Sequence, residues 1–418
     1  MHERELESFA RRLGMWLRSL SLTQFRNYAR LEWRLEPRVI MVYGGNAQGK
    51  TNLLEAIAYA AMGHSFRTSS DRELIHWAAW QDPMPFARVI AEFVRKDGPV
   101  RLELALVAEG SGPSQSILAP ETAPIRKQAR INGIPHRVLD LFGQAAVVLF
   151  TPQDVEVVGG PPVERRRLLD LLIAQTSPAF ARILAAYQRA LSQRNALLRR
   201  LQEEGSDPAQ LDLWDESVAR YGAPLMDQRA RALQAIARYA EDIHKALSGG
   251  EPMLLRYVPS LDPFQAEGQM ALGVLTWGER LQEVELRETF RRALLRERSQ
   301  DIRRGTTRIG PHRDDFRFIV DGVDVGLYGS RGQQRTAILA FKLAAARWLA
   351  SIFQESPVLL LDEVMAELDG ERRRYLLRAL EDVEQAIVTT TDPMLFEPEF
   401  RERVRRFVVR AGFLREER

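Results

Sequence analysis

Residues 44–51 read Gly44-Gly45-Asn46-Ala47-Gln48-Gly49-Lys50-Thr51. This octapeptide fits the phosphate-binding loop pattern G-x-x-x-x-G-K-[ST] at every position. Glycine lets the backbone N–H groups of such a loop point inward at phosphate oxygens, and a following helix adds the partial positive charge of its N-terminus. In this pattern the lysine reaches the β- and γ-phosphates and the threonine hydroxyl ligates Mg²⁺. We therefore predict an ATP site at the loop, with Asn52 included.

The sequence on both sides of the loop has the secondary structure that the pattern requires. Val39 to Tyr43 form a continuous apolar run of strand length. Residues 52–62 place Leu53, Leu54 and Ile57 at helical spacing. A loop between a buried strand and a helix is the context in which this pattern binds phosphate. The context therefore favours a phosphate site over a chance glycine-rich turn.

A second motif is the apolar run of residues 358–361, which ends in Asp362-Glu363. An apolar strand that ends in two carboxylates is the expected second half of a nucleoside triphosphatase. We predict that Asp362 holds Mg²⁺, directly or through water, and that Glu363 acts as the general base on the attacking water. The alternative is a solvated strand end, but carboxylates after a buried strand are otherwise hard to explain because charges are costly to bury.

A third motif, placed before a predicted long helix, is Tyr328-Gly329-Ser330-Arg331-Gly332-Gln333-Gln334-Arg335. A serine hydroxyl and the free N–H groups of a helix start can bind an anion. The segment resembles the signature sequence of ABC-type ATPases, with Arg331 where the first of two glycines often stands. In that superfamily the signature contacts the γ-phosphate bound by the other subunit. The resemblance therefore implies an ATP-dependent dimer, and an ordinary polar helix cap is the alternative.

The composition excludes several classes of protein. The chain has 418 residues with 59 Lys+Arg against 56 Asp+Glu, and no cysteine. Disulfide scaffolds, cysteine zinc sites and thiol nucleophiles are therefore excluded. No uninterrupted apolar run reaches the ~18–20 residues that span a bilayer, and the charged N-terminus lacks the apolar core of a signal peptide. We expect a cytoplasmic protein with no membrane contact. Only five basic residues are lysine, namely Lys50, Lys96, Lys127, Lys245 and Lys342.

The order of the predicted elements indicates a discontinuous domain. Strand patterns dominate residues 15–43 and 87–150, with hairpin signals at Asp97-Gly98 and Asn132-Gly133. Helical periodicity dominates from Val163 to Gly249 and again from Leu281 to Arg304, and α/β segments return after Thr307. We predict an α/β P-loop ATPase domain of the ABC/SMC-head type with an inserted helical arm. Its expected bounds are 15–160 with 301–418 for the ATPase domain, 161–300 for the arm and 1–14 for an N-terminal extension.

In this order and spacing, the motifs resemble the RecF family of bacterial recombination mediators, which is related to the heads of SMC proteins. The resemblance covers about residues 15–412. It rests on the three motifs above and on further blocks: Leu22-Thr23-Gln24-Phe25-Arg26-Asn27-Tyr28, Asp71-Arg72-Glu73-Leu74, Pro152-Gln153-Asp154, Arg165-Arg166-Arg167, Gln193-Arg194-Asn195, Leu213-Trp214-Asp215 and Gly310-Pro311-His312-Arg313-Asp314-Asp315. The set is far more specific than any one of its members.

The resemblance implies roles for residues outside the three motifs. Arg26 and Asn27 would lie beside the nucleotide, and Glu367 and Asp369 would belong to a loop that crosses the dimer interface. Gln153 occupies a position where the family usually has a carboxylate near Mg²⁺, so its metal contact is the weakest of the set. Thr391 stands where many ABC ATPases place a histidine that senses the γ-phosphate. Threonine forms hydrogen bonds but carries no positive charge, so we expect a weak ATPase.

The resemblance also implies partners. The ATP-bound homodimer would bind duplex DNA and single/double-strand junctions, and with RecR and RecO it would help load the strand-exchange protein RecA. Phosphate contacts would dominate and would weaken with salt. Candidate clusters are Arg165 to Arg167, Arg194, Arg199-Arg200, Arg291-Arg292 and Arg303-Arg304. The competing interpretation is that arginines on long helices form ordinary solvated faces.

Two other readings stay open at this point. The chain could be another ABC/SMC-type ATPase head, either a transporter subunit or a short SMC-like protein. It could also be a nuclease or a scaffold, and Asp314-Asp315 is the candidate acidic pair for a nuclease metal site. That pair is also consistent with the edge of a hairpin, since Asp321-Gly322 forms a turn signal shortly after it.

Overall fold

The computed structural model describes residues 14–109, 124–205, 207–261 and 283–417. The chain divides into two compact units, one of Met1–Gln153 with Ala345–Arg418 and the other of Asp154–Ala344. The boundaries expected from the sequence were 160 and 301. The second unit extends further because β10 pairs with β9, which keeps residues 315–320 with the helical segment. Of the predicted extension at residues 1–14, only Gly14 is described.

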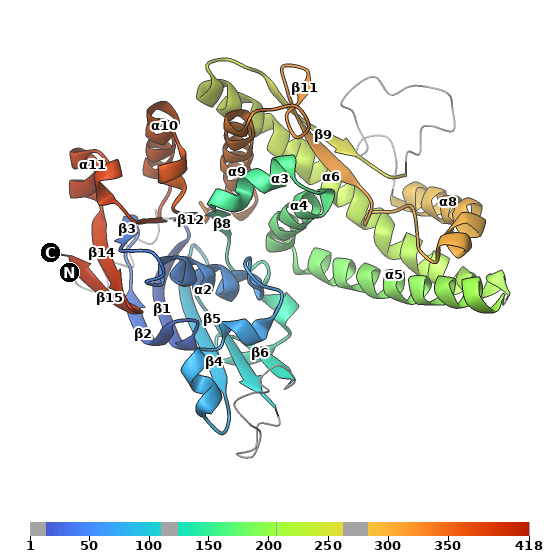
Figure 1. Ribbon diagram of the computed structural model, residues 1–418, viewed down its shortest axis with the longest axis horizontal. Coiled ribbons are helices and arrows are strands. Elements are labelled where there is room, and N and C mark those ends of the chain that lie inside the picture. The colour runs from blue at the N-terminus through green and yellow to red at the C-terminus, as the bar shows by residue number, and fades with distance from the viewer. Residues whose placement is uncertain (1–13, 110–123, 206, 262–282, 418) are drawn as a thin grey trace. The chain divides into compact units, whose positions relative to one another are not determined.

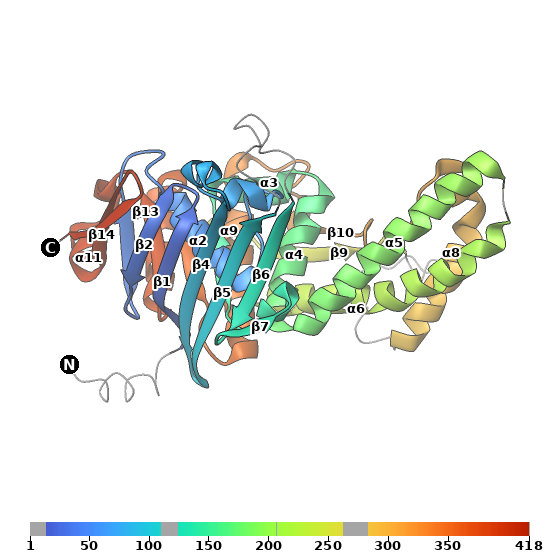
Figure 2. The same cartoon turned by 90° about the horizontal axis from the view of Figure 1, so that it is seen from below.

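The first unit contains an antiparallel six-stranded sheet in the order β2-β1-β4-β5-β6-β7 (Figure 2). Both predicted hairpin turns are confirmed: Gly98 opens β5 directly after β4, and Asn132-Gly133 join β6 to β7. Asn132 and Gly133 have φ of 51° and 81°, which these turn residues tolerate best. The strands are β1 (Trp16–Phe25), β2 (Tyr28–Arg34), β4 (Phe86–Arg95), β5 (Gly98–Ala108), β6 (Ile125–Ile131) and β7 (Ile134–His136).

The second sheet of this unit is mainly parallel, in the order β15-β14-β3-β13-β12-β8. Only β15 runs antiparallel to its neighbour. The strands that precede the phosphate-binding loop and the Asp362-Glu363 motif, β3 and β12, flank β13, and because the three strands are parallel they end at one edge of the sheet. The strands are β3 (Val39–Tyr43), β8 (Val147–Phe150), β12 (Val358–Asp362), β13 (Ala386–Thr390), β14 (Arg405–Arg410) and β15 (Phe413–Glu417).

Helix α2 (Lys50–Met62) forms the core between the two sheets, as Figure 1 shows. It contacts β4 and β5 of the antiparallel sheet and β12 and β13 of the parallel sheet. Every residue from Leu53 to Met62 is buried, which explains why this helix is apolar on all sides except at Glu55. The unit also contains α10 (Gly370–Glu381), α11 (Pro398–Arg403) and the 3₁₀ turns η1 (Asp71–Leu74), η2 (Trp77–Gln81), η4 (Val138–Leu141), η5 (Pro152–Asp154), η8 (Val364–Glu367) and η9 (Pro393–Leu395).

The second unit is mostly helical and carries a three-stranded antiparallel sheet in the order β11-β10-β9. Helices α5, α6 and α8 contact one another, and α6 also packs on β9. The predicted turn at Asp321-Gly322 joins β10 to β11. The elements are α3 (Val155–Gly159), α4 (Pro162–Thr176), α5 (Pro178–Glu204), η6 (Pro208–Leu211), α6 (Asp212–Ser248), β9 (Met253–Val258), α8 (Glu283–Arg304), β10 (Asp315–Val320) and β11 (Val323–Asp324).

Helix α9 (Arg331–Phe353) follows the signature segment and continues into the first unit. Within the described residues it is the one helix that is long and apolar enough to cross a membrane by length and composition, and 78% of that stretch is buried in the protein. This burial is typical of a core helix. Its charged residue Lys342 is also buried and pairs with Asp154, at 2.5 Å.

Candidate nucleotide site

The phosphate-binding loop occupies the turn between β3 and α2, where the sequence predicted it. Gly44 and Gly49 adopt φ of 155° and 118°, in a region that side chains strongly disfavour. A Cβ at Gly44 would lie 2.4 Å from the carbonyl oxygen of Val409, and one at Gly49 would lie 2.6 Å from the side-chain nitrogen of Asn27. Both positions therefore require glycine for conformation and for space.

Neighbouring residues hold the carbonyl groups of the loop. Asn27 donates a hydrogen bond to the Gln48 carbonyl at 2.9 Å, and the Tyr28 hydroxyl donates to the Gly49 carbonyl at 3.0 Å. Burial raises the pKa of Tyr28, so this hydroxyl keeps its proton. From the β14–β15 turn, the Gly412 amide also donates to the Gln48 carbonyl, at 3.1 Å. With these carbonyls engaged, the amides of the loop and of the first turn of α2 are the groups left to bind phosphate.

Lys50 is the first residue of α2 and is only 5% exposed. Its ammonium group donates to the carbonyl oxygens of Gly44 at 2.7 Å and Gly45 at 2.9 Å. It also lies 3.0 Å from a carboxylate oxygen of Glu363. A compact ammonium with three donors suits this cradle of oxygens, whereas a planar guanidinium does not.

Thr51 and Asp362 meet at the edge of the parallel sheet and form a candidate metal site. The Thr51 hydroxyl lies 2.9 Å from both carboxylate oxygens of Asp362, which is 6% exposed. Burial raises the pKa of Asp362, while hydrogen bonds from the Thr389 and Thr51 hydroxyls lower it. Because burial makes the negative charge of Asp362 unfavourable, a nearby cation would stabilise the ionised carboxylate. Hydroxyl and carboxylate oxygens are ligands that Mg²⁺ prefers, so these residues fit that ion.

No cluster of three or more His, Cys, Asp or Glu residues within the described part of the chain could hold a metal by itself.

Glu363 follows Asp362 and turns out of the strand. It adopts φ of 55°, a left-handed conformation that is uncommon for a residue with a side chain. Its amide donates to the Thr389 hydroxyl at 3.1 Å, and its carboxylate accepts from the Thr391 amide at 3.0 Å. The strained turn and these two bonds fix the carboxylate beside Lys50. Thr391 therefore orients Glu363 through its backbone, in a way that its residue type did not reveal.

The structure places Arg26 in a buried network beside α2. Its guanidinium forms two hydrogen bonds of 2.8 Å with the fully buried Glu55. The Ser65 hydroxyl donates to the same carboxylate at 2.5 Å. Arg26 was expected beside the nucleotide, and its charge is already matched by Glu55. Asn27 instead contacts the loop directly and accepts a hydrogen bond from Asn52 at 2.8 Å.

Arg67 is a functional candidate that the sequence analysis missed. It is 43% exposed and donates to the side-chain oxygen of Asn52 at 2.6 Å. Its charge also lowers the pKa of Asp362, although burial is the larger effect there. Thr389 was missed as well, although its hydroxyl donates to Asp362 at 2.9 Å. Neither residue belongs to a recognisable sequence motif. Arg67 lies in a loop and Thr389 in β13, and only the folded structure brings them close to Asn52 and Asp362.

The remaining predicted residues of the first unit lie on 3₁₀ turns and at a helix N-terminus. Gln153 is exposed on η5, after β8, and no hydrogen bond among the described residues joins it to Thr51 or Asp362. Glu367 is exposed on η8. Asp369 is also exposed and caps α10 by accepting from the Arg372 amide at 3.0 Å.

The signature segment belongs to the second unit and forms the N-terminus of α9. The Ser330 hydroxyl accepts from the Gln333 amide at 3.2 Å, while the Gln333 side chain accepts from the Ser330 amide at 3.0 Å. This reciprocal pair is a capping box. Gln334 is buried and donates to the Val325 carbonyl at 3.0 Å. Arg331 and Gly332 are exposed, and no described residue accepts from their amides in the first turn of α9, so these N–H groups can bind an anion.

Two of the candidate DNA-binding arginines, Arg165 and Arg194, are buried in ion pairs and are not available to DNA. Arg165 is 2% exposed and pairs with Asp315 at 2.7 Å. Arg194 is fully buried and bridges Asp215 at 2.7 Å and Asp301 at 2.8 Å. These arginines hold the helices together, because a buried carboxylate needs a partner.

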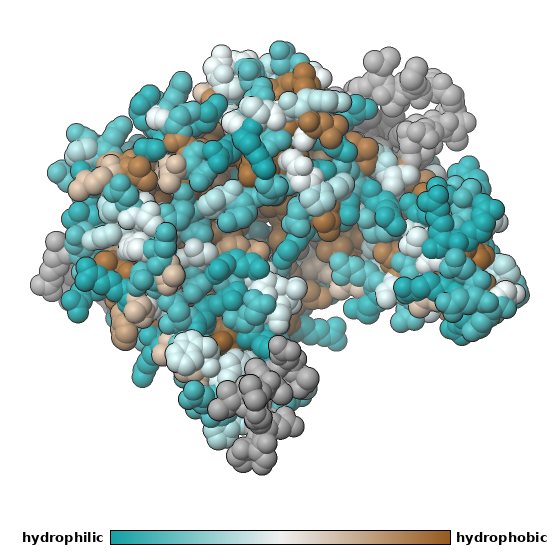
Figure 3. All heavy atoms as spheres, viewed as in Figure 1, coloured by the Kyte–Doolittle hydropathy of each residue, from teal (hydrophilic) through white to brown (hydrophobic). Residues whose placement is uncertain are grey.

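Other candidate arginines of α5 and α8 are exposed, and the visible surface of these helices is mostly hydrophilic in Figure 3. Arg199, Arg200, Arg303 and Arg304 are exposed. Arg291 and Arg292 share Glu288, whose pKa their hydrogen bonds lower to about 2, so that part of the surface carries a compensated charge.

The structure gives no support to a nuclease site at Asp314-Asp315. Asp314 is fully buried and accepts from the Tyr257 hydroxyl at 2.5 Å. Asp315 is 6% exposed and pairs with Arg165 and Arg317. Both carboxylates are engaged in the fold and are not arranged as metal ligands.

Comparison with known proteins agrees with these features. The model of the RecF/RecN/SMC N terminal domain family matches residues 16–412. The DNA replication and repair protein RecF of Chloroflexus aggregans is 41% identical over 408 residues, which cover 96% of this chain and 99% of that protein. With such a relative matched along its whole length, the alternative of a transporter subunit or a short SMC-like protein is set aside.

Solved structures show the same relationship. A structure of the recombination mediator protein RecF with ATP, in the RecFOR pathway, has a TM-score of 0.80 and 30% identity, covering 97% of this chain and 98% of that one. An Smc head domain from Pyrococcus furiosus has a TM-score of 0.51 and 17% identity, covering 96% of each chain, and shows the fold alone. The predicted fold class, an SMC-head-like P-loop ATPase domain with a helical arm, is confirmed.

Proposed function

The chain belongs to the RecF family of DNA replication and repair proteins, and we propose that it binds and slowly hydrolyses ATP to control its own dimerisation on DNA. It would act in the cytoplasm in recombinational repair, on duplex DNA and single/double-strand junctions. The observation that carries this proposal is the meeting of Lys50, Thr51, Asp362 and Glu363 at one edge of the parallel sheet. A glycine-rich loop and two carboxylates in this arrangement are the parts that phosphoryl transfer requires.

ATP binding would use the loop amides, Lys50 and the start of α2. The amides and the helix N-terminus stabilise the phosphates without any cost of reorganisation, because the hydrogen bonds described above already fix the loop. Phosphate oxygens would take over the ammonium of Lys50 from Glu363. Arg67 supplies a second, exposed cation close to Asn52.

Thr51 and Asp362 would hold Mg²⁺. The ion, when bound, neutralises the charge that develops on the β- and γ-phosphates. Thr389 donates to Asp362 and so keeps its carboxylate turned toward Thr51.

Hydrolysis would depend on Glu363 as general base. Its carboxylate is oriented by the Thr391 amide and becomes able to accept a proton from water once Lys50 pairs with phosphate. Thr391 brings no charge to the γ-phosphate, which supports slow turnover.

Dimerisation would bring the exposed N-terminus of α9 to the nucleotide of a second copy. Ser330 uses its oxygen lone pairs for the Gln333 amide, so its O–H remains available to donate to a γ-phosphate. The amides of Arg331 and Gly332 add to the same anion site. Glu367 and Asp369 would lie in the interface loop, and RecR with RecO would be the protein partners.

A gel-shift series with and without ATP tests this function. Wild-type protein is expected to bind duplex DNA more tightly with ATP, and Lys50→Ala is expected to lose that increase. Light scattering on the same samples should show an ATP-dependent dimer for the wild type only. Equal DNA binding and a constant molecular mass with and without ATP would refute the proposal.

A further inference from the structure

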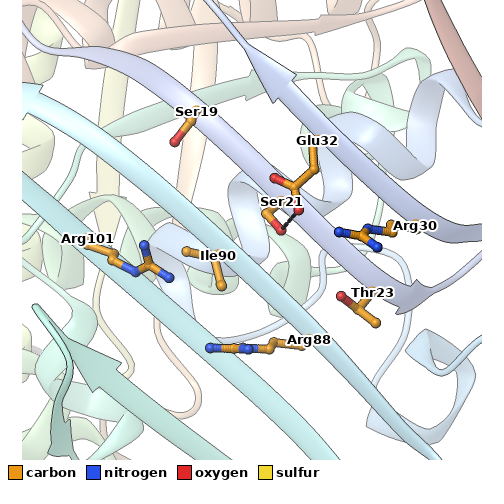
Figure 4. A pocket seen from close by; sticks show the side chains of 8 residues that line it. All are labelled: Ser19, Ser21, Thr23, Arg30, Glu32, Arg88, Ile90 and Arg101. Carbon is orange, nitrogen blue, oxygen red and sulfur yellow. Dashed lines mark hydrogen bonds between the residues drawn. The ribbon is translucent and has the colours of Figure 1, made fainter.

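The outward face of the antiparallel sheet carries an open hollow of about 440 Å³. Figure 4 shows the side chains that line it. Three hydroxyl residues follow one another along β1, and arginines from β2, β4 and β5 surround them. They are Ser19, Ser21, Thr23, Arg30, Arg88 and Arg101. None of these residues belongs to the nucleotide site.

The register of the strands sets the arrangement of these side chains. Thr23 lies directly opposite Arg30 on β2 and Arg88 on β4. Neighbouring strands are about 4.8 Å apart, so the two arginines stand roughly 10 Å apart with the hydroxyl between them. Ser19 is likewise flanked by Arg34 on β2 and by Glu92, which lies opposite Arg101. The sheet thus presents hydroxyl groups between columns of guanidinium groups.

The charge of this face is strongly positive. Its outward positions on β1, β2, β4, β5 and β6 carry seven arginines and three glutamates, whereas the whole chain has a formal net charge of only +3. Two of the glutamates are matched by Arg18 and Arg88, and Glu32 accepts a hydrogen bond from the Ser21 hydroxyl. The arginines are Arg18, Arg30, Arg34, Arg88, Arg101, Arg126 and Arg130, and the glutamates are Glu32, Glu92 and Glu103.

Four of these arginines are free to bind an anion. Within the described residues, no ion pair and no side-chain hydrogen bond engages the guanidinium of Arg30, Arg34, Arg101 or Arg130, and all four residues are exposed. By contrast, Arg165 and Arg194 of the helical unit are buried in ion pairs. Four unpaired arginines of the first unit therefore lie together on this sheet.

The chemistry of the face fits a phosphodiester backbone better than a protein partner. Arginine and hydroxyl side chains are among the groups with which proteins contact DNA phosphates. Protein interfaces depend on aromatic and apolar anchors, and none of the strongly exposed large apolar residues lies at an outward position of these five strands. Single-stranded DNA binding usually needs aromatic rings on which bases stack, and the same absence favours a duplex.

We propose that the outward face of the antiparallel sheet, centred on Ser19, Ser21, Thr23, Arg30, Arg34 and Arg101, binds the phosphate backbone of duplex DNA without nucleotide. The site lies within one chain and needs neither the phosphate-binding loop nor a second copy. The inference deepens the proposed function, on which it rests, by adding a DNA contact that each monomer makes. This binding is independent of sequence and falls steeply with salt.

A charge-reversal variant tests the site. The full-length triple variant Arg30→Glu, Arg34→Glu, Arg101→Glu is compared with wild type by fluorescence anisotropy of a labelled 30-base-pair duplex, without ATP. We expect affinity at 0.1 M salt to fall by roughly 100-fold and the slope of log K against log salt to become shallower by about three. The control, Arg378→Glu, Arg403→Glu, Arg415→Glu, reverses three exposed arginines elsewhere in the same unit and should bind as wild type does.

Further measurements separate folding, function and ligand class. The triple variant should keep its circular dichroism spectrum and its affinity for a fluorescent ATP analogue, and the milder triple alanine variant should show a smaller loss of DNA binding. Unchanged affinity and salt slope in the charge-reversal variant, or competition by poly-glutamate as effective as competition by DNA, would overturn the inference. Wild-type protein that binds DNA only with ATP would overturn it too while leaving the proposed function intact, whereas no DNA binding under either condition would refute the proposed function.

Discussion

Lys50 and Glu363 form an ion pair of 3.0 Å at the edge of the parallel sheet, although one begins α2 and the other follows β12. The pair joins the residue that would bind the γ-phosphate to the residue that would activate water. The Lys50 ammonium cannot pair fully with Glu363 and with a phosphate at the same time. Nucleotide binding would therefore release the Glu363 carboxylate from this ion pair. Several predictions depend on this site and on the buried charges of the helical unit.

The variant Glu363→Gln should separate binding from hydrolysis. An amide cannot accept the proton from water, so we expect hydrolysis to fall by about 10²–10⁴-fold. ATP affinity should stay equal or rise, because Lys50 loses a competing carboxylate. Phosphate release and calorimetric titration measure the two effects, with the exposed Glu371→Gln as the control. A parallel loss of ATP affinity would show that Glu363 supports binding instead.

Asp362→Asn should stabilise the protein while it impairs the metal site. Burial raises the pKa of Asp362, so the ionised carboxylate is less favourable in the folded state than in the unfolded state. The free energy of unfolding therefore falls as the pH rises through this raised pKa and Asp362 ionises. A neutral amide removes this cost, so urea unfolding at pH 8 should show a higher free energy of unfolding than wild type. Mg²⁺-dependent hydrolysis should be lost. Lower stability at pH 8 would contradict the assignment.

Ser330 can be tested with two substitutions that differ in helix capping. Aspartate keeps the N-cap of α9 but brings a negative charge toward the γ-phosphate, while alanine removes the cap at a cost of about 1 kcal/mol. Both variants should lose the ATP-dependent dimer in light scattering, and only Ser330→Ala should lower the free energy of unfolding. Dimers formed by Ser330→Asp would mean that this hydroxyl does not meet phosphate.

His312 should make the stability of the protein depend on pH. Burial lowers the pKa of His312 to about 4, and its ring nitrogens contact the Tyr187 hydroxyl at 2.6 Å and the Thr307 carbonyl at 3.0 Å. The ring must donate to Thr307 and accept from Tyr187, which requires the neutral form. The unfolded state takes up its proton near pH 6.5, so up to about 3 kcal/mol of stability should be lost as pH falls from 6.5 to 4. His312→Gln should show a flatter stability curve over this range, and identical curves would contradict the prediction.

Arg194 should be essential to the helical unit. It is fully buried between Asp215 and Asp301, so Arg194→Met leaves Asp301 without its ion-pair partner and Asp215 with Arg298 alone. We expect the free energy of unfolding to fall by about 3–5 kcal/mol. Adding Asp215→Asn and Asp301→Asn should recover part of that loss, whereas the exposed control Arg199→Met should change little. A loss under 1 kcal/mol, measured by urea denaturation, would show that the network is dispensable.

Much of the fold could be predicted because its signals are local. The hairpin turns at Asp97-Gly98, Asn132-Gly133 and Asp321-Gly322 were read from two residues each, since those turns need residues that tolerate positive φ. The capping of α9 is also a local signal, because Ser330 and Gln333 lie within one turn of the helix. The domain bounds differ because the pairing of β10 with β9 joins segments on either side of α8.

By itself, the sequence determined the phosphate-binding loop, the carboxylates Asp362 and Glu363 and the signature segment, because each motif is contiguous and its chemistry depends on adjacent backbone groups. Only the tertiary structure decided that Thr389 supports Asp362, that Arg194 is buried and that free arginines gather on one sheet face. These facts depend on strand order and on which helix faces meet. Burial and charge pairing are set by residues far apart in the chain, so no local pattern carries them.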